Sequence, residues 1–141
     1  MRYAFSRGAI GAALLFLSCS AGFPADPFPF DRELLLDAAP MRPGKRMPIL
    51  NVEPNGNARI DLWCRTVPAR VEISDASIKI EPTPLPDSPP EMQSAGQCTA
   101  ERMQADEELL ATLAQVTGWR REGEDIVLEG PKVLNFRTSD H

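Results

Sequence analysis

Histidine, tyrosine and cysteine are scarce in this sequence of 141 residues, and it has no long apolar run. There is one His, at position 141, one Tyr, and three Cys. Most zinc centres and Ser-His-Asp triads need histidine at the reacting atoms, so this composition excludes most of that chemistry. No segment approaches the roughly 20 apolar residues that a membrane-spanning helix requires.

Basic residues are also outnumbered, with 15 Lys and Arg against 20 Asp and Glu and a net charge of −5. An acidic chain lacks the cationic surface that binds phosphate backbones, so nucleic acid is not expected as a partner. The 43% apolar and 25% charged residues are typical of a globular protein, and the length suits about one domain.

The first 22 residues have the pattern of a secretory signal peptide. Arg2 and Arg7 precede an apolar run over residues 9–17, and small residues follow at 18–22. This order predicts cleavage after Ala21 or Gly22 and export to the periplasm or the cell exterior.

Cys19 allows a second interpretation, in which the protein is an outer-membrane lipoprotein acylated at this residue. Phe16 and Leu17 fit the usual lipoprotein box poorly, because it has an aliphatic and then a small residue at those positions. Acylation would anchor the protein to a membrane, which is otherwise not an expected partner.

Cleavage leaves two cysteines, Cys64 and Cys98, in an oxidising compartment, which favours a disulfide between them. A redox-active pair usually has the Cys-x-x-Cys spacing, and these residues are 34 positions apart. A metal site would need more ligands than two thiolates and His141. We therefore expect a structural disulfide, with no metal or other cofactor.

Three Pro in residues 23–30 predict an extended leader over residues 23–31. Packing of its Phe side chains on the domain or a simple linker is expected, with a partner-binding motif as the alternative. A first short strand is expected at residues 33–37. Apolar and polar residues then alternate in segments that predict a four-stranded antiparallel meander over residues 47–81. Asn55-Gly56 is expected to form a type I′ hairpin turn within it.

Five Pro between positions 82 and 90 predict an exposed, stiff loop. A helix follows, with Thr99 as its cap, a buried stripe over Leu109, Leu110, Leu113, Ala114 and Val116, and Gly118 as a left-handed end. Asp106, Glu107 and Glu108 are expected on its solvated face. Three more strands are predicted at residues 119–122, 126–129 and 132–137. The fold class is therefore α+β, a curled antiparallel sheet of about eight short strands packed on one α-helix.

This order of features resembles the META domain family, the HslJ-like heat-shock proteins of bacterial envelopes. The resemblance covers residues 32–138. It rests on residues 59–65 (RIDLWCR) in the place of the family's Gly-Cys-Asn segment, on the hairpin 74–82, and on residues 96–99 (GQCT) at the second Cys. It continues through the helix and its exit at 107–113 and 116–120 and the last hairpin at 125–128 and 133–136. Trp63 and Arg65 stand where the family usually has Gly and Asn.

The resemblance implies a cracked antiparallel barrel around one helix in an envelope protein linked to stress and envelope maintenance. It implies no established catalytic residues. The first functional hypothesis is accordingly a non-enzymatic module that contacts a protein, a lipid or the membrane. Its candidate exposed residues are Trp63, Trp119, Arg120 and Arg121, because aromatic and Arg side chains dominate interface energies. For Trp63, covering by a neighbouring loop is the favoured alternative.

Two other hypotheses remain. A curled sheet can enclose an apolar pocket, which would suit a carrier of a small apolar ligand. A carboxylate-dependent hydrolase would need an acid–base pair, such as Asp61 with Glu72 or Glu124 with Asp125. Both pairs occupy polar strand or turn positions, where charged side chains usually face solvent and take no part in catalysis.

Overall fold

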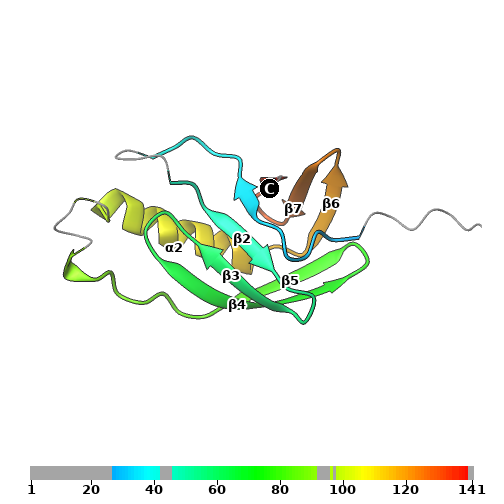
Figure 1. Ribbon diagram of the computed structural model, residues 1–141, viewed down its shortest axis with the longest axis horizontal. Coiled ribbons are helices and arrows are strands. Elements are labelled where there is room, and N and C mark those ends of the chain that lie inside the picture. Colours follow the sequence, from blue (N-terminus) through cyan, green and yellow to red (C-terminus); the bar gives the residue numbers. More distant parts are fainter. Residues whose placement is uncertain (1–26, 42–45, 92–95, 97, 140–141) are drawn as a thin grey trace, which may run out of the picture.

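The computed structural model describes residues 27–41, 46–91, 96 and 98–139, which form a closed antiparallel barrel of eight strands with one helix packed against it (Figure 1). The α+β prediction is therefore confirmed. Each strand pairs with the next, and β8 returns to pair with β1. The elements are β1 (Leu34–Leu36), β2 (Ile49–Val52), β3 (Asn57–Asp61), β4 (Thr66–Ser74), β5 (Ser77–Pro82), α2 (Ala100–Ala114), β6 (Gly118–Glu122), β7 (Asp125–Glu129) and β8 (Leu134–Thr138).

The signal peptide predicted at residues 1–22, including Cys19, lies outside the described residues, as do residues 23–26 of the leader. Within the described part of the chain, no helix combines the length and apolar character needed to cross a membrane.

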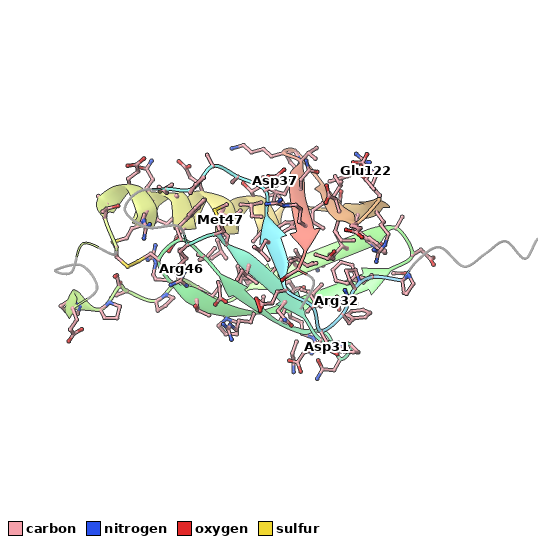
Figure 2. All side chains as sticks on the ribbon, turned by 45° about the horizontal axis from the view of Figure 1, so that its top comes forward. Asp31, Arg32, Asp37, Arg46, Met47 and Glu122 are labelled. Carbon is pink, nitrogen blue, oxygen red and sulfur yellow. A yellow bond between two sulfur atoms is a disulfide. The ribbon has the colours of Figure 1, made fainter. Side chains whose placement is uncertain are left out.

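The strands of the meander bury alternate side chains because successive residues of a strand point to opposite faces. In β4, Val67, Ala69 and Val71 are buried and the residues between them are exposed. Ile60 lies opposite Val67 and Val71 lies opposite Ile80, so the inward sides of neighbouring strands meet in register. Charged residues such as Asp31, Asp37 and Glu122 are exposed on the outside (Figure 2).

The turn between β2 and β3 differs from the predicted type I′ turn. Gly56 has a positive φ of 93°, but Asn55 does not, and a type I′ turn needs both. The Gly56 amide donates to Glu53 O at 2.9 Å, and the Asn57 amide donates to Asn55 Oδ1 at 2.9 Å. Pro54 fixes a negative φ, which favours a three-residue turn that ends in a left-handed glycine.

The helix begins where the sequence predicts, because Thr99 Oγ1 accepts a hydrogen bond from the Arg102 amide at 3.2 Å. It ends at Gln115 in a right-handed conformation. Gly118 has no positive φ and instead starts β6, so its predicted role as a left-handed cap is wrong. A Cβ at Gly118 would approach Ala76 O at 3.3 Å, which indicates that glycine permits close packing of two chain segments there.

The buried face of α2 is polar in its first half and apolar in its second. Its buried residues are Arg102, Asp106, Leu109 and Leu113. Asp106 is fully buried, so the expectation that it belongs to the solvated face is wrong. Glu107 and Glu108 are exposed, as expected.

The Pro-rich segment over 82–90 is tied to the barrel rather than exposed throughout. Ser88 is buried, and Leu85 packs against the hydrophobic core. Pro86 O accepts a hydrogen bond from Arg65 Nη1 at 3.1 Å. Proline removes amide donors but leaves carbonyl oxygens, and one of these carbonyls fixes the loop in place.

The barrel closes through one narrow seam. The chain leaves the sheet after β5 to form α2 and rejoins it at β6, and those two strands share only the Ser77–Gly118 register pair. Two backbone hydrogen bonds hold this seam, from the Ile78 amide to Thr117 O at 3.1 Å and from the Trp119 amide to Ala76 O at 2.9 Å.

Candidate functional site

The described end of the leader, Pro27–Phe30, packs against the barrel beside two hairpin tips. Phe28 is 4% exposed and belongs to the hydrophobic core, and Phe30 packs against that core. The Asp31 amide then donates to Val52 O at 2.8 Å, which ties the leader to the end of β2. Of the sequence-based options for the Phe side chains, packing on the domain is therefore the one observed for Phe28 and Phe30.

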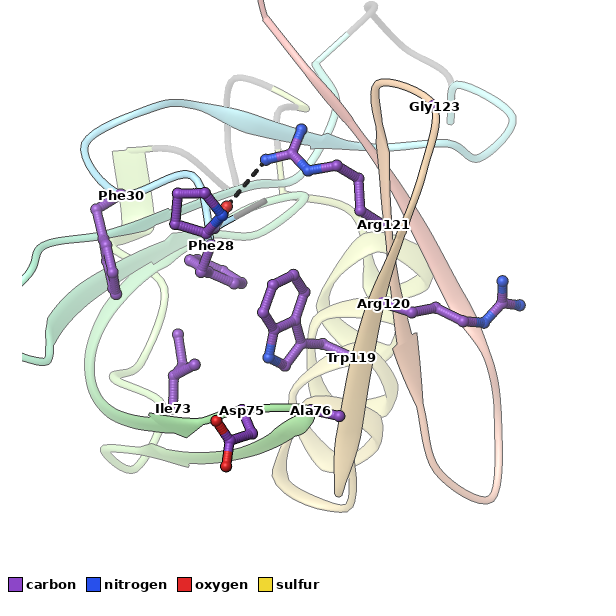
Figure 3. A pocket seen from close by; sticks show the side chains of 10 residues that line it. Phe28, Phe30, Ile73, Asp75, Ala76, Trp119, Arg120, Arg121 and Gly123 are labelled. Carbon is purple, nitrogen blue, oxygen red and sulfur yellow. Dashed lines mark hydrogen bonds between the residues drawn. The ribbon is translucent and has the colours of Figure 1, made fainter. Parts of the chain in front are cut away.

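A pocket of about 1020 Å³ lies between this leader and the tips of the β4–β5 and β6–β7 hairpins (Figure 3). We call it the leader-end pocket. Its lining residues are Pro27, Phe28, Phe30, Ile73, Asp75, Ala76, Trp119, Arg120, Arg121 and Gly123. Figure 1 shows these hairpin tips on the right of the view and the start of α2 on the left.

The walls of the leader-end pocket are mainly aromatic and aliphatic. The rings of Phe28 and Trp119 meet edge to face with centroids 5.2 Å apart, and Phe28 and Phe30 are 5.3 Å apart. Such contacts fix aromatic side chains in place beyond the effect of burial alone. Ile73 faces these rings across the hollow (Figure 3). A preformed apolar concavity with few polar groups is the usual form of a small-molecule site.

The indole nitrogen of Trp119, in the pocket wall, has no hydrogen-bond partner within the described part of the chain. Trp119 is 8% exposed, and its Nε1 is buried without a hydrogen-bond acceptor among the described residues. Figure 3 shows this nitrogen on the side of the indole ring that faces Ile73 and Asp75. Leaving a buried N–H unpaired costs about 1–3 kcal/mol, so the arrangement favours an incoming acceptor.

The cationic side chains around the pocket already have partners. Arg121 Nη2 donates to Pro27 O at 3.1 Å, which clamps the leader over the pocket. Arg120 forms ion pairs with Glu122 and Glu129, and hydrogen bonds to these carboxylates raise the pKa of Arg120. Its side chain points away from the hollow (Figure 3).

The predicted surface residues divide into two groups. Arg120 is exposed and Arg121 is partly exposed, whereas Trp63 and Trp119 are only 6% and 8% exposed. Trp119 is therefore not the exposed residue that was expected, and for Trp63 the structure agrees with covering by neighbouring chain and not with exposure. Trp63 follows the end of β3 and is buried, because the chain turns at Leu62–Arg65 instead of continuing the alternation of a strand. Trp119 and both Arg line the leader-end pocket.

A separate buried cluster holds α2 to the barrel. Cys64 and Cys98 form a disulfide with their Cα atoms 5.3 Å apart, and both are buried. This disulfide is consistent with an oxidising compartment outside the cytosol. The Asp106 carboxylate accepts hydrogen bonds from the Cys64 and Arg65 amides, both at 3.0 Å, and from Arg65 Nε at 3.1 Å.

Arg65 completes this cluster. Its Nη2 donates to Met103 O at 2.9 Å, and its remaining Nη1 binds the Pro-rich segment. All of these donors and acceptors satisfy one another, which is the condition for a buried ion pair to be tolerated. The cluster is therefore structural and has no unpaired group to offer a substrate.

Of the two carboxylate pairs considered for a hydrolase, the structure separates Asp61 from Glu72. Asp61 lies opposite Thr66 at one end of the β3–β4 ladder, while Glu72 lies opposite Lys79 in the next ladder. Burial acts to raise the pKa of Asp61, but hydrogen bonds from Arg59 and Thr66 and nearby positive charge outweigh it and lower that pKa. Glu124 and Asp125 lie at the β6–β7 turn, where Glu124 is exposed. No group of acidic, His or Cys residues among the described residues has the arrangement of a metal site.

Comparisons with family models, with curated proteins and with solved structures found no match to this chain. The geometry of the leader-end pocket therefore carries the functional argument.

Proposed function

We propose that this protein is an exported, non-enzymatic envelope protein of the META/HslJ type that binds a small apolar ligand in its leader-end pocket. The observation that carries the proposal is the pocket itself, about 1020 Å³ of mainly apolar concavity with the unpaired Trp119 Nε1 donor in its wall. Its volume is at the upper end of the range usual for small-molecule sites.

This proposal places binding in a pocket and not on an exposed aromatic surface. Phe28, Trp63 and Trp119 are buried, so they offer little apolar area to a protein partner. Interface hot spots are aromatic side chains that a partner can cover, and these three are already covered by the domain itself. The envelope role, in maintenance or stress response, is supported by the META-like order of features and by the disulfide.

The test of ligand binding is a fluorescence titration of the purified mature protein with the neutral dye N-phenyl-1-naphthylamine. We expect dye emission to rise on binding, and Ile73→Glu to abolish the rise because it places a charge in the pocket wall. Val133→Glu is the matched control, since Val133 is 60% exposed and is not among the pocket residues. Dye binding that is absent from the wild type, or unchanged in a folded Ile73→Glu variant, would contradict the proposed function.

We also propose that the mature chain resides in the periplasm or outside the cell, after cleavage near Gly22, with outer-membrane anchoring if Cys19 is acylated. Intact mass of the exported protein distinguishes these forms. An unmodified N-terminus at Gly22 or Phe23 excludes the lipoprotein, and a mass that includes acyl chains on Cys19 establishes it.

A further inference from the structure

We infer that the ligand of the leader-end pocket is a neutral amphiphile, an aliphatic chain with one ester or amide carbonyl whose oxygen accepts a hydrogen bond from Trp119 Nε1. This inference rests on the proposed function, because it names the chemistry of the molecule that occupies the same pocket.

The need for an acceptor follows from the state of Trp119. More than nine-tenths of this side chain is buried, its N–H has no acceptor among the described residues, and the nitrogen lies on the side of the ring toward Ile73 and Asp75 (Figure 3). Buried indole N–H groups usually find a partner. An incoming oxygen would satisfy this group and remove the cost of leaving it unpaired.

The shape of the acceptor follows from the depth of the nitrogen. Nε1 itself is buried, so an acceptor reaches it only when the side chains around it shift. A single oxygen that projects from a chain, as in a carbonyl, needs a smaller shift than a bulky headgroup. Phe28, Phe30 and Ile73 then provide the apolar wall for the chain.

The neutrality of the ligand follows from the charges around the pocket. Asp75 lies on the side toward which the indole nitrogen points, so an anion placed there would be repelled (Figure 3). Arg120 is neutralised by Glu122 and Glu129 and points away from the hollow. Arg121 lies on the opposite side of the indole ring, next to the leader (Figure 3). A carboxylate at Nε1 would therefore face Asp75 without an arginine beside it.

The experiment displaces the bound dye with three matched ligands below their micellar concentrations. These are 1-decanoylglycerol, the corresponding decyl glycerol ether, which lacks the carbonyl, and decanoate, which is an anion. We expect the ester to displace the dye at about five- to tenfold lower concentration than either of the others, the effect of one buried hydrogen bond.

Variants of single residues assign the preference to the groups named above. Trp119→Phe keeps an aromatic ring but removes the N–H, so we expect it to abolish the preference for the ester over the ether. Trp63→Phe is the matched control, because Trp63 is buried outside the pocket, and it should retain that preference. Asp75→Asn should improve decanoate binding several-fold, and Asn tolerates the positive φ of 49° at this position.

The outcomes separate this inference from the proposed function. If the dye binds in the pocket but the ester has no advantage, or if Trp119→Phe retains the advantage, the inference is overturned and the binding function stands. Stronger binding of decanoate than of the ester by the wild type also overturns it. If no dye binds, the proposed function fails and the inference fails with it.

Discussion

Asp106 is fully buried, and its hydrogen-bond partners Cys64 and Arg65 lie more than 40 positions before it in the sequence. It accepts hydrogen bonds from two backbone amides and from the guanidinium of Arg65, so its charge is matched without water. Its role is to fix the first half of α2 against the turn that follows β3.

We expect Asp106→Ala to lower the free energy of unfolding by about 3–5 kcal/mol, because it leaves the buried Arg65 charge without its partner. Urea denaturation followed by circular dichroism measures this loss. Glu107→Ala, at the exposed neighbouring position, should change stability by less than about 0.5 kcal/mol. Equal effects of the two substitutions would contradict the structural role of Asp106.

The ionisation of Asp61 makes the free energy of unfolding depend on pH in the acid range. Hydrogen bonds from Arg59 and Thr66 hold its pKa below the usual value despite its partial burial. A carboxyl whose pKa is lower in the folded state stabilises that state above its unfolded pKa of about 3.9, and this stabilisation is lost as pH falls through the folded pKa.

The wild type should therefore be more stable than Asp61→Asn at about pH 7, and the two should converge as pH falls toward about 2. Urea midpoints over this range measure the difference. We expect it to be small, because Arg59 is exposed to solvent. A difference that grows below about pH 4 would have the wrong sign for this assignment.

Sequence periodicity identified most of the buried apolar residues and missed the buried charges. The positions of Arg102 and Asp106 continue the helical spacing of Leu109 and Leu113, but a hydrophobicity pattern counts charged residues as solvated. The burial of Asp106 depends on donors from Cys64 and Arg65, which are distant in sequence. For the same reason, the sequence could not predict that Trp119 has an unpaired nitrogen.

The disulfide fixes the position of α2, because it joins Cys98, just before this helix, to Cys64 in the turn after β3. It closes a loop that includes β4, β5 and the Pro-rich segment. We expect Cys64→Ala with Cys98→Ala to lower the free energy of unfolding by about 3.5–4 kcal/mol on the chain-entropy estimate. Thiol titration of the denatured, unreduced wild-type mature protein should detect no reactive thiol at these positions, and two reactive thiols would refute the bond.

The described leader residues Phe28 and Phe30 pack in or against the barrel core. We expect Phe28→Ala to lower the free energy of unfolding by about 3–5 kcal/mol, because it removes a buried ring that contacts Trp119 and Phe30. Thermal and urea denaturation measure the loss, with the exposed Val133→Ala as the control. Unchanged stability would show that residues 27–30 do not pack as described.

At the level of elements, local signals predicted the helix start, the meander and the last hairpin, since each depends on alternation or capping within a few residues. The strand β4 begins before Pro68, which lies beyond the last β4–β5 register pair, Ala69–Pro82, where the missing amide breaks no β4–β5 register pair. The leader-end pocket was not predictable, as it combines the leader with two hairpin tips more than 40 residues apart.

The shortest strand pairing of the described barrel is the seam between β5 and β6, with one register pair. Only the amides of Ile78 and Trp119 cross it, whereas the β3–β4 and β4–β5 ladders extend over five and six register pairs. We expect native-state hydrogen exchange to show lower protection for these two amides than for the ladder amides, because fewer bonds must break to open the seam. Equal protection would mean that the barrel opens only as a unit.

The pairing of β1 with β8 makes the first strand of the domain depend on the last one made. Leu34 lies opposite Thr138 and Leu36 lies opposite Phe136, so one edge of β1 has no partner until the end of the chain is present. Contacts between such distant residues form slowly, and unpaired edges invite association with other chains. While β8 is still held out of the sheet, this edge of β1 stays open, and association with other chains is favoured at that stage of biosynthesis more than at any later one.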